Sequence, residues 1–165
     1  MNLPSTSAGP ISRVAEPPPL PEILEVRRER RLAAGFAVVG AVVFAVAAGL
    51  NPYDEDGRPR SHGTHRQLGL PPCAMKIVTG IGCPSCGMTT TFSLLMHGDH
   101  SAAWRANWAG CVVAGLALIA TGWFAVVAVG FPPGRLTADE VVKMVAVIGT
   151  GAAVMRWLAV TLAAS

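Results

Sequence analysis

The sequence predicts an all-α integral membrane protein with three transmembrane helices, a short cysteine-bearing helix that is re-entrant or interfacial, and a disordered N-terminal arm. The first observation is composition: of 165 residues, 52% are hydrophobic and 14% charged, and the mean hydropathy is +0.47. A soluble domain usually carries roughly 25% charged residues. The second is that three long stretches are almost free of charge. The third is that an apolar segment between them is broken by glycine and proline.

The N-terminal region is rich in proline and arginine. Six of the 13 prolines lie within the first 21 residues, and a charged run from Glu22 to Arg31 follows them. Because proline at this density prevents regular helix, we predict a disordered Pro/Arg-rich cytoplasmic arm over residues 1–31. The stretch Leu32–Leu50 has no charged residue. It is long enough to cross a hydrocarbon core of ~30 Å, so residues 32–50 are the first predicted span.

Arginines set the predicted orientation of this span. Arg27, Arg28, Arg30 and Arg31 stand directly before it, and basic residues in a short flank usually stay in the cytoplasm. We therefore predict a cytoplasmic N-terminus. A cleavable signal peptide is the alternative, because residues 45–47 resemble a small-residue cleavage site and the paired arginines resemble a twin-arginine header.

Two further spans are predicted in the second half of the chain. Residues 109–131 have no charged residue and end at a Pro-Pro-Gly sequence that stops a helix. Residues 141–162 form the other span. Thr137 and Glu140 precede it at the spacing of a capping box, in which each side chain closes an open amide at the start of the helix. We expect one membrane domain over residues 32–164.

The region between the first two spans is not uniform. Residues 51–67 are rich in charge and predict a solvated loop. Residues 77–98 have no charged residue, but three glycines and a proline interrupt the first half and disfavour one continuous helix. We predict that a cysteine segment over residues 68–98 dips toward the membrane and forms a short helix from about Pro84 to His97, with its irregular backbone covered by protein. Three spans place the C-terminus outside. If residues 77–98 cross, there are four spans and both termini are inside.

The most informative residues are Cys83 and Cys86 in the run Cys-Pro-Ser-Cys-Gly, with Cys73 ten positions before the first of them. Proline suits the first turn of a helix, so we expect the two cysteines to flank a helix start, where open amides and the helix dipole favour the thiolate. A polar stripe follows Cys86 along this helix and predicts a membrane-embedded binding pocket; its members are Thr90, Ser93 and His97. The alternative is that these hydroxyls bond only to the helix backbone.

Three chemistries compete for the cysteines. In a redox site, Cys83 and Cys86 form a reversible disulfide and Cys73 is the resolving or exchanging partner. In a zinc site, the three cysteines hold the ion with a fourth ligand. The candidates for that ligand are His97, His100 and the pair His62 and His65. In a structural or binding segment, a static disulfide or close packing holds the loop against the helices. A lone Cys-x-x-Cys does not decide among them.

Arg156 and Asp99 complete the candidate binding residues. Arg156 lies within the third predicted span, on the side of the cysteine segment in the three-span topology. A cation there snorkels to the interface, faces other helices or marks a site. It could lower a cysteine pKa, pair with Asp99, or bind an anionic lipid or substrate. Asp99 is also predicted to cap a short helix over residues 100–107.

Charge and the remaining motifs exclude several function classes. The 13 basic and 10 acidic residues give a net charge of +3, which is too mild to predict a nucleic-acid partner. The sequence has no phosphate-binding glycine loop with a lysine, no Gly-x-Ser-x-Gly elbow, no paired metal histidines on a helix and no nucleotide fingerprint. These absences favour a protein that is not an enzyme.

Four runs form an ordered string of motifs between the first two predicted spans. The runs are Gly69-Leu70-Pro71-Pro72-Cys73, Thr79-Gly80-Ile81-Gly82-Cys83-Pro84-Ser85-Cys86-Gly87-Met88-Thr89-Thr90, His97-Gly98-Asp99 and Trp104-Arg105-Ala106-Asn107. This string resembles a bacterial membrane-protein family, the domain of unknown function 2752. The resemblance covers roughly residues 68–131, and it implies a multi-pass protein of the bacterial cytoplasmic (inner) membrane without an established activity. Thr90 stands where the family often has arginine, and Trp108 where it often has proline.

The leading functional hypothesis is a non-enzymatic binding or structural membrane component. Its cysteine segment would bind a partner protein, a metal or a lipid, and the lipid bilayer would surround it. One alternative is a membrane thiol–disulfide oxidoreductase that uses Cys83 and Cys86. The other is a zinc-binding membrane protein.

Overall fold

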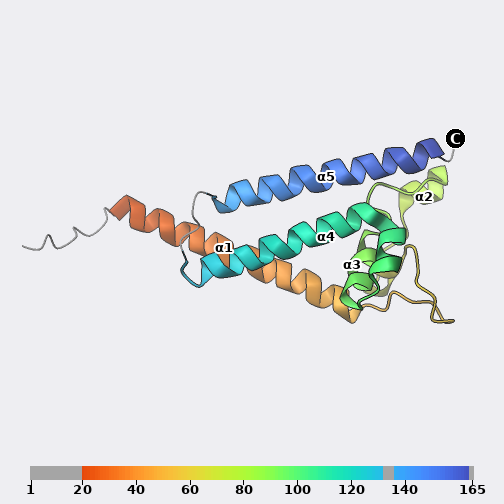
Figure 1. Cartoon of the computed structure of the whole chain (residues 1–165), viewed down its shortest axis with the longest axis horizontal. Coiled ribbons are helices and arrows are strands. Elements are labelled where there is room, and N and C mark those ends of the chain that lie inside the picture. The colour runs from red at the N-terminus through yellow and green to blue at the C-terminus, as the bar shows by residue number, and fades with distance from the viewer. Residues whose placement is uncertain (1–19, 132–135, 164–165) are drawn as a thin grey trace, which may run out of the picture.

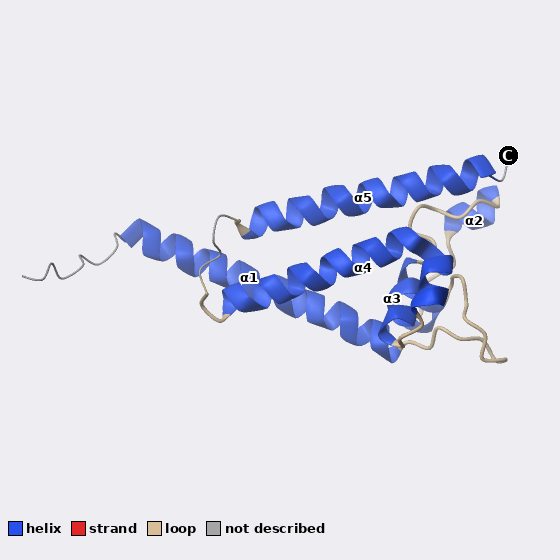
Figure 2. Cartoon of the chain, in the orientation of Figure 1, coloured by secondary structure: helices blue, strands red, loops and turns tan. Residues whose placement is uncertain are grey.

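Three long apolar helices form the body of the molecule. The computed structural model describes residues 20–131 and 136–163. Helix α1 spans Leu20–Gly49, α4 spans His100–Ala128 and α5 spans Ala138–Ala163 (Figure 1). Each is long and apolar enough to cross a membrane. The part of the chain that the structure describes is helical with connecting loops and has no strand (Figure 2). The predicted all-α class with three candidate spans is confirmed.

Helix α1 starts well before the first predicted span of residues 32–50. It begins at Leu20 and includes the arginine run, because a proline at position 21 falls in the first helical turn, where the missing amide costs no hydrogen bond. The predicted disorder of the arm therefore does not hold for residues 20–31. Residues 1–19 lie outside the described part of the chain.

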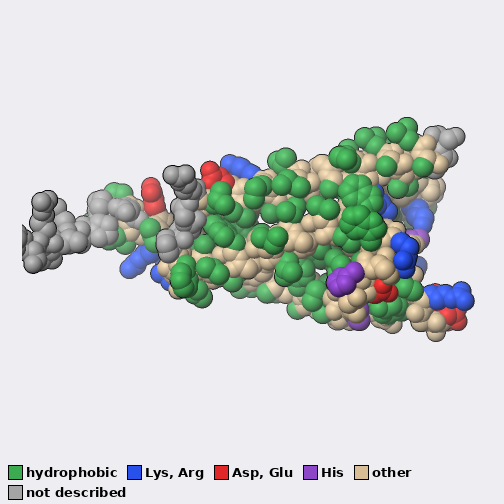
Figure 3. All heavy atoms as spheres, in the orientation of Figure 1, with side chains coloured by type: hydrophobic (Ala, Val, Ile, Leu, Met, Phe, Trp, Pro, Cys, Tyr) green, Lys and Arg blue, Asp and Glu red, His purple; other side chains and the backbone are tan. Residues whose placement is uncertain are grey.

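The outer faces of the three long helices are apolar and uncovered. Val38 on α1 is 62% exposed, Ile119 on α4 is 72% exposed and Val147 on α5 is 73% exposed. Figure 3 shows hydrophobic side chains along the helices, while charged side chains gather toward the two ends of the molecule. Apolar surface of this extent is unfavourable in water. It fits a lipid bilayer around the helices.

Small residues allow α1 and α4 to pack closely. A Cβ atom on Gly40 would collide with the side chain of Thr121. Phe36 and Phe124 stack nearby, with ring centroids 5.1 Å apart. Close backbone approach at glycine is a common basis of helix association in membranes, and here it joins the middle of α1 to the C-terminal third of α4.

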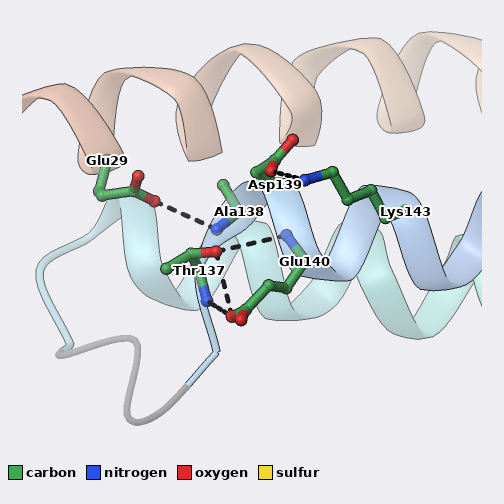
Figure 4. A network of polar contacts seen from close by, with 6 residues as sticks. All are labelled: Glu29, Thr137, Ala138, Asp139, Glu140 and Lys143. Atoms are coloured by element: carbon green, nitrogen blue, oxygen red, sulfur yellow. Dashed lines mark hydrogen bonds and ion pairs between the residues drawn. The ribbon is translucent and has the colours of Figure 1, made fainter.

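The start of α5 is capped as predicted and is also tied to α1. Glu140 Oε2 accepts hydrogen bonds from Thr137 N at 2.8 Å and Thr137 Oγ1 at 3.1 Å, and Glu140 N donates to Thr137 Oγ1 at 3.3 Å. Glu29 of α1 accepts a further bond from the amide of Ala138 at 3.1 Å (Figure 4). An acidic group at a helix start is favourable because it complements the helix dipole. This contact joins the first and last long helices.

Short helices gather at the opposite end of the molecule. A 3-10 helix η1 spans Thr64–Leu68, α2 spans Ala74–Thr79 and α3 spans Met88–Met96 (Figure 1). Helix α3 packs against α1 and α4. The predicted short helix is confirmed, but it begins at residue 88 instead of about 84, and α2 was not predicted. Since residues 77–98 hold these short elements, the alternative with four spans is wrong.

Candidate metal centre and basic pocket

Three cysteine thiols converge at the end of the molecule that carries the short helices. The Sγ atoms of Cys73, Cys83 and Cys86 all lie within 4.8 Å of one another, and each residue is half-buried. The sulfurs of Cys83 and Cys86 are 3.4 Å apart, and Ser85 Oγ lies 3.2 Å from Cys83 Sγ. The structure therefore brings together the three cysteines that the sequence singled out.

Two chain reversals produce this convergence. Cys73 directly precedes α2, and α2 ends at Gly80, which has a φ of 73° and turns the chain back. Cys83 and Cys86 lie in the turn before α3, with Cys86 N donating to Cys83 O at 3.0 Å. The helix itself starts only after Gly87. The prediction that these cysteines flank a helix start with proline in its first turn is therefore corrected: they form a separate turn ahead of it.

The surroundings favour the thiolate form of Cys73 and disfavour that of Cys86. The backbone amides of Lys76 and Cys83, followed by the thiols of Cys83 and Cys86, lower the pKa of Cys73 to about 6. Burial, followed by the side-chain hydrogen bonds with Cys83 and Cys73, raises the pKa of Cys86 to about 11. Sequence reasoning placed the reactive thiolate at Cys83 or Cys86. The structure moves it to the residue before α2.

Asn107 fastens the cysteine turn to α4. It is fully buried, and its extended backbone, with φ −160° and ψ 97°, divides α4 into two parts. Its Nδ2 donates to Cys86 O at 3.0 Å, and its Oδ1 accepts from Gly110 N at 3.0 Å. One side chain thus caps the second part of α4 and holds the backbone of the cysteine turn. The sequence predicted a helix end at this residue but not its contact with the cysteines.

Gly87 fits where no other residue would. Its φ is +83°, in the left-handed region that favours glycine. A Cβ atom there would lie 2.7 Å from Ser61 O and 3.3 Å from Ala106 O. The glycine of the Cys-Pro-Ser-Cys-Gly run is therefore fixed both by its backbone conformation and by the close approach of the loop and α4.

Arg156 binds the backbone at the break in α4. Its Nη2 donates to Ala106 O at 3.0 Å. This carbonyl lacks its usual helical partner because Gly110 N donates to the Asn107 side chain instead. Arg156 is half-buried and contacts neither a cysteine nor Asp99 within hydrogen-bond distance. The Arg156 side chain therefore supplies the hydrogen bond that Ala106 O lacks within α4, and it links α5 to α4.

Among the other predicted binding residues, Thr90 lines a pocket, whereas Ser93, His97 and Asp99 make hydrogen bonds elsewhere. Thr90 lines the pocket described below and accepts a hydrogen bond from Thr64 Oγ1 at 2.9 Å. Ser93 donates to Leu50 O at 2.7 Å, and His97 Nδ1 donates to Ser93 O at 2.8 Å. Asp99 accepts from Ala102 N at 3.0 Å and caps α4 as predicted. The hydroxyls therefore join separate segments, and the predicted stripe does not converge on one pocket.

A cavity of about 670 Å³ opens beside the thiols. Its polar wall comes mainly from the solvated loop, which the sequence connected with the cysteines only through His62 and His65 as candidate zinc ligands. The basic residues that line the cavity are Arg60, His62, His65, Arg66 and Lys76. None of its lining residues is acidic. We call this cavity the basic pocket. The one further sign of this pocket in the sequence is the density of basic residues in 51–67. Only the fold shows that these residues lie beside Cys73.

The surroundings of His62 in this wall favour its neutral form. Its Nε2 accepts a hydrogen bond from Lys76 Nζ at 2.6 Å, and its Nδ1 lies 2.8 Å from Ser61 Oγ. Burial, followed by the charges of Lys76 and His65, lowers the pKa of His62. A neutral imidazole adds no positive charge and keeps the capacity to accept a proton or bind a metal.

The donor chemistry of the three cysteines suits a metal ion. In the described residues, 20–131 and 136–163, they form the one group of three metal-binding side chains whose ligand atoms meet. His97, a predicted fourth ligand, is not part of that group and does not line the basic pocket, and neither does His100. His62 and His65 do line it. Three thiol sulfurs with an open side toward a pocket match the ligands of zinc sites.

One comparison with known proteins bears on this segment. Residues 73–121 match the model of a family described as "Protein of unknown function (DUF2752)". The predicted resemblance is thereby confirmed over the cysteine segment and most of α4. No curated protein and no solved structure matches the chain.

Proposed function

We propose that this protein is a zinc-binding membrane protein whose ion is held by Cys73, Cys83 and Cys86. The observation that carries the proposal is the convergence of three thiols, within 4.8 Å of one another, from two separate turns. A redox pair needs only two cysteines. A zinc site needs at least three protein ligands, and Cys73 supplies the third sulfur from a separate turn. Three protein ligands leave the fourth position of the ion for water or another ligand.

The charge of the surroundings supports this ligand set. Zn²⁺ with three thiolates carries a net charge of −1, and a nearby positive charge favours the deprotonated thiol. The basic pocket supplies Arg60, Arg66 and Lys76 on the open side of the cluster. Metal binding would deprotonate Cys86 despite its raised pKa, because a coordinating thiol loses its proton to the ion.

The surrounding hydrogen bonds would keep the ligands in place. Asn107 holds Cys86 O, and Gly87 lets the turn lie against Ala106 O. Contacts outside the ligand set orient metal ligands and commonly change metal affinity 10–100-fold when they are removed. The zinc would therefore couple the loop to the break in α4.

We also assign the site to the outer face of the bacterial inner membrane. Four arginines lie at the start of α1, at the end of the molecule opposite the cysteines, and such residues favour the cytoplasm. With three spans, the cysteine end and the C-terminus then face outward. Labelling of an engineered cysteine at Glu55 by an impermeant maleimide in intact cells tests this orientation, and labelling only after lysis would contradict it.

The zinc content of purified protein tests the function. We expect about one zinc per chain in the wild type and loss of zinc in each of three variants, Cys73→Ser, Cys83→Ser and Cys86→Ser. Cys111→Ser is the matched control, because Cys111 is also half-buried but lies on α4 outside the cluster. Equal zinc in all five proteins, or none in the wild type purified with zinc present, would contradict the proposal.

A thiol–disulfide oxidoreductase is the second candidate function, and one distance favours it. The 3.4 Å between the sulfurs of Cys83 and Cys86 needs only a small movement to reach a disulfide bond of about 2.05 Å. Bond formation would pass two electrons and two protons to a disulfide-bearing partner, whose disulfide would become two thiols. Thiol trapping in intact cells separates the candidates: these two cysteines would change together with redox poise in an oxidoreductase, and stay reduced in a zinc site.

A further inference from the structure

A second cavity lies next to the basic pocket and has the opposite chemistry. It measures about 290 Å³ and is open to the lipid-facing side of α1. We call it the apolar groove. Its walls are formed chiefly by Val42, Val43 and Val46 of α1 and by Met88, Thr89 and Phe92 of α3. A hydrocarbon chain in this groove would cover apolar side chains that are otherwise exposed.

The two cavities meet at the start of α3. Met88 and Thr89 line both of them. Leu50, at the end of α1, closes the groove on the same side. The groove therefore runs along the membrane-spanning part of α1, and the basic pocket begins where that helix ends. This is the depth at which the head group of a lipid lies when its chain follows a transmembrane helix.

The basic pocket has positive charge without a matching carboxylate. Arg60, Arg66 and Lys76 line it, and the one ion pair in residues 20–131 and 136–163 is between Lys143 and Asp139 on α5. Lys76 contacts the neutral His62 instead of an acid. A pocket with this charge favours an anionic ligand.

We propose that the basic pocket and the apolar groove together bind one anionic phospholipid, with its phosphate near Arg60, Arg66 and Lys76 and an acyl chain along Val42, Val43 and Val46. A free anion would use only the pocket and a neutral lipid only the groove. The ligand that satisfies both cavities carries a negative phosphate and a hydrocarbon chain in one molecule. The cations and valines are not metal ligands, so lipid binding does not require the zinc.

Binding of three probes to the purified full chain in a neutral detergent tests this proposal. The probes are a short-chain phosphatidylglycerol, the phosphatidylcholine with the same chains, and glycerol phosphate, which has an anionic group without chains. Binding is measured on zinc-loaded and on chelator-treated protein, so failure of the zinc proposal does not decide the result. We expect phosphatidylglycerol to bind at least about fivefold more tightly than either other probe in both preparations.

Variants assign the binding to the two cavities. Arg66→Gln combined with Lys76→Gln should weaken phosphatidylglycerol binding about 25-fold, at about fivefold for each charge, whereas Arg58→Gln, a nearby exposed cation outside the pocket, should change it less than twofold. Val46→Trp should fill the groove and weaken binding of the lipid but not of glycerol phosphate. Val39→Trp, on an exposed face of α1 outside the groove, is its control. Thermal unfolding confirms that each variant is folded.

Three results would overturn the proposal. Equal affinity for phosphatidylglycerol and phosphatidylcholine would show that charge has no role. Tight binding of glycerol phosphate with no effect of Val46→Trp would show that the pocket takes a free anion. An equal loss in the Arg58→Gln control would show a general surface attraction to negative charge instead of a site.

Discussion

Asn107 Nδ2 donates a hydrogen bond to Cys86 O across 3.0 Å, from the break in α4 to the turn that carries the thiols. The same break leaves Ala106 O without its helical hydrogen-bond donor, and this oxygen accepts a hydrogen bond from Arg156 of α5 instead. Three separate parts of the chain are thus joined at one buried position. A change in the cysteine turn is expected to reach both long helices through it.

Replacement of Asn107 by alanine should lower the free energy of unfolding by about 2–4 kcal/mol. The reason is that Cys86 O and Gly110 N would lose their partner, and an unsatisfied buried polar group costs about 1–3 kcal/mol. Both bonds measure 3.0 Å; the bond from Gly110 N is buried and the bond to Cys86 O is partly buried. Denaturant unfolding in mixed micelles, followed by circular dichroism, measures the change.

Asn107→Asp separates the two roles of this side chain. Aspartate keeps an acceptor for Gly110 N but removes the donor to Cys86 O. We expect it to retain the cap on the second part of α4 and to lower zinc affinity about tenfold. Zinc affinity equal to that of the wild type would show that the contact with Cys86 does not position the ligand.

Gly87→Ala should be more destabilising than the same change at another glycine with positive φ. Alanine at position 87 would take a left-handed conformation and also place its Cβ 2.7 Å from Ser61 O. Gly57 is the control, because its φ is +76° but nothing lies within 4 Å of an added Cβ. We expect a loss of about 1 kcal/mol for Gly57→Ala and at least about 3 kcal/mol for Gly87→Ala, measured by denaturant unfolding. Equal losses would mean that the close contact does not matter.

The sequence predicted the long helices well because their patterns are local. Charge-free stretches of sufficient length identify spans, and Thr137 with Glu140 gives a cap that the structure confirms. The start of α1 was missed because the prolines before it were weighed against a helix, although one of them fits the first turn. Helix α2 was missed because six residues carry too little periodicity to be recognised.

The candidate site was only half predictable. The three cysteines are visible in the sequence, but which of them carries the thiolate depends on amides and thiols that only the fold brings to Cys73. Arg156 bonds to Ala106 O because a helical hydrogen bond is missing there. No residue type in the sequence indicates that missing bond. The basic pocket joins the loop to α2 and α3 across many residues. Contacts between residues far apart in the chain leave no local pattern in the sequence from which the pocket could be predicted.

Replacement of Arg156 should destabilise the contact between α4 and α5. Arg156→Met keeps the apolar stem and removes the donor to Ala106 O, so we expect a loss of about 1–3 kcal/mol. Arg156→Lys keeps a donor and should lose less. Thermal unfolding of the detergent-solubilised protein compares the two. If Arg156 instead only reached the membrane surface, both variants would unfold like the wild type.

Alkylation of the metal-free protein should depend on pH in a residue-specific way. The thiolate reacts and the thiol does not, so a pKa of about 6 makes Cys73 reactive at neutral pH and progressively unreactive as the pH falls below 6. Cys86, with a pKa of about 11, should stay protected across the neutral range. Iodoacetamide labelling followed by peptide mapping measures each site. Faster labelling of Cys86 than of Cys73 at pH 7 would contradict the assignment.

X-ray absorption at the zinc edge of the purified protein tests the central claim most directly, because it identifies the atoms around the ion. We predict three sulfur neighbours at about 2.3 Å and one nitrogen or oxygen neighbour at about 2.0–2.2 Å, with a sulfur removed in Cys73→Ser. A shell that contains only nitrogen and oxygen, or one with two sulfurs that Cys73→Ser leaves unchanged, would contradict the three-cysteine zinc centre.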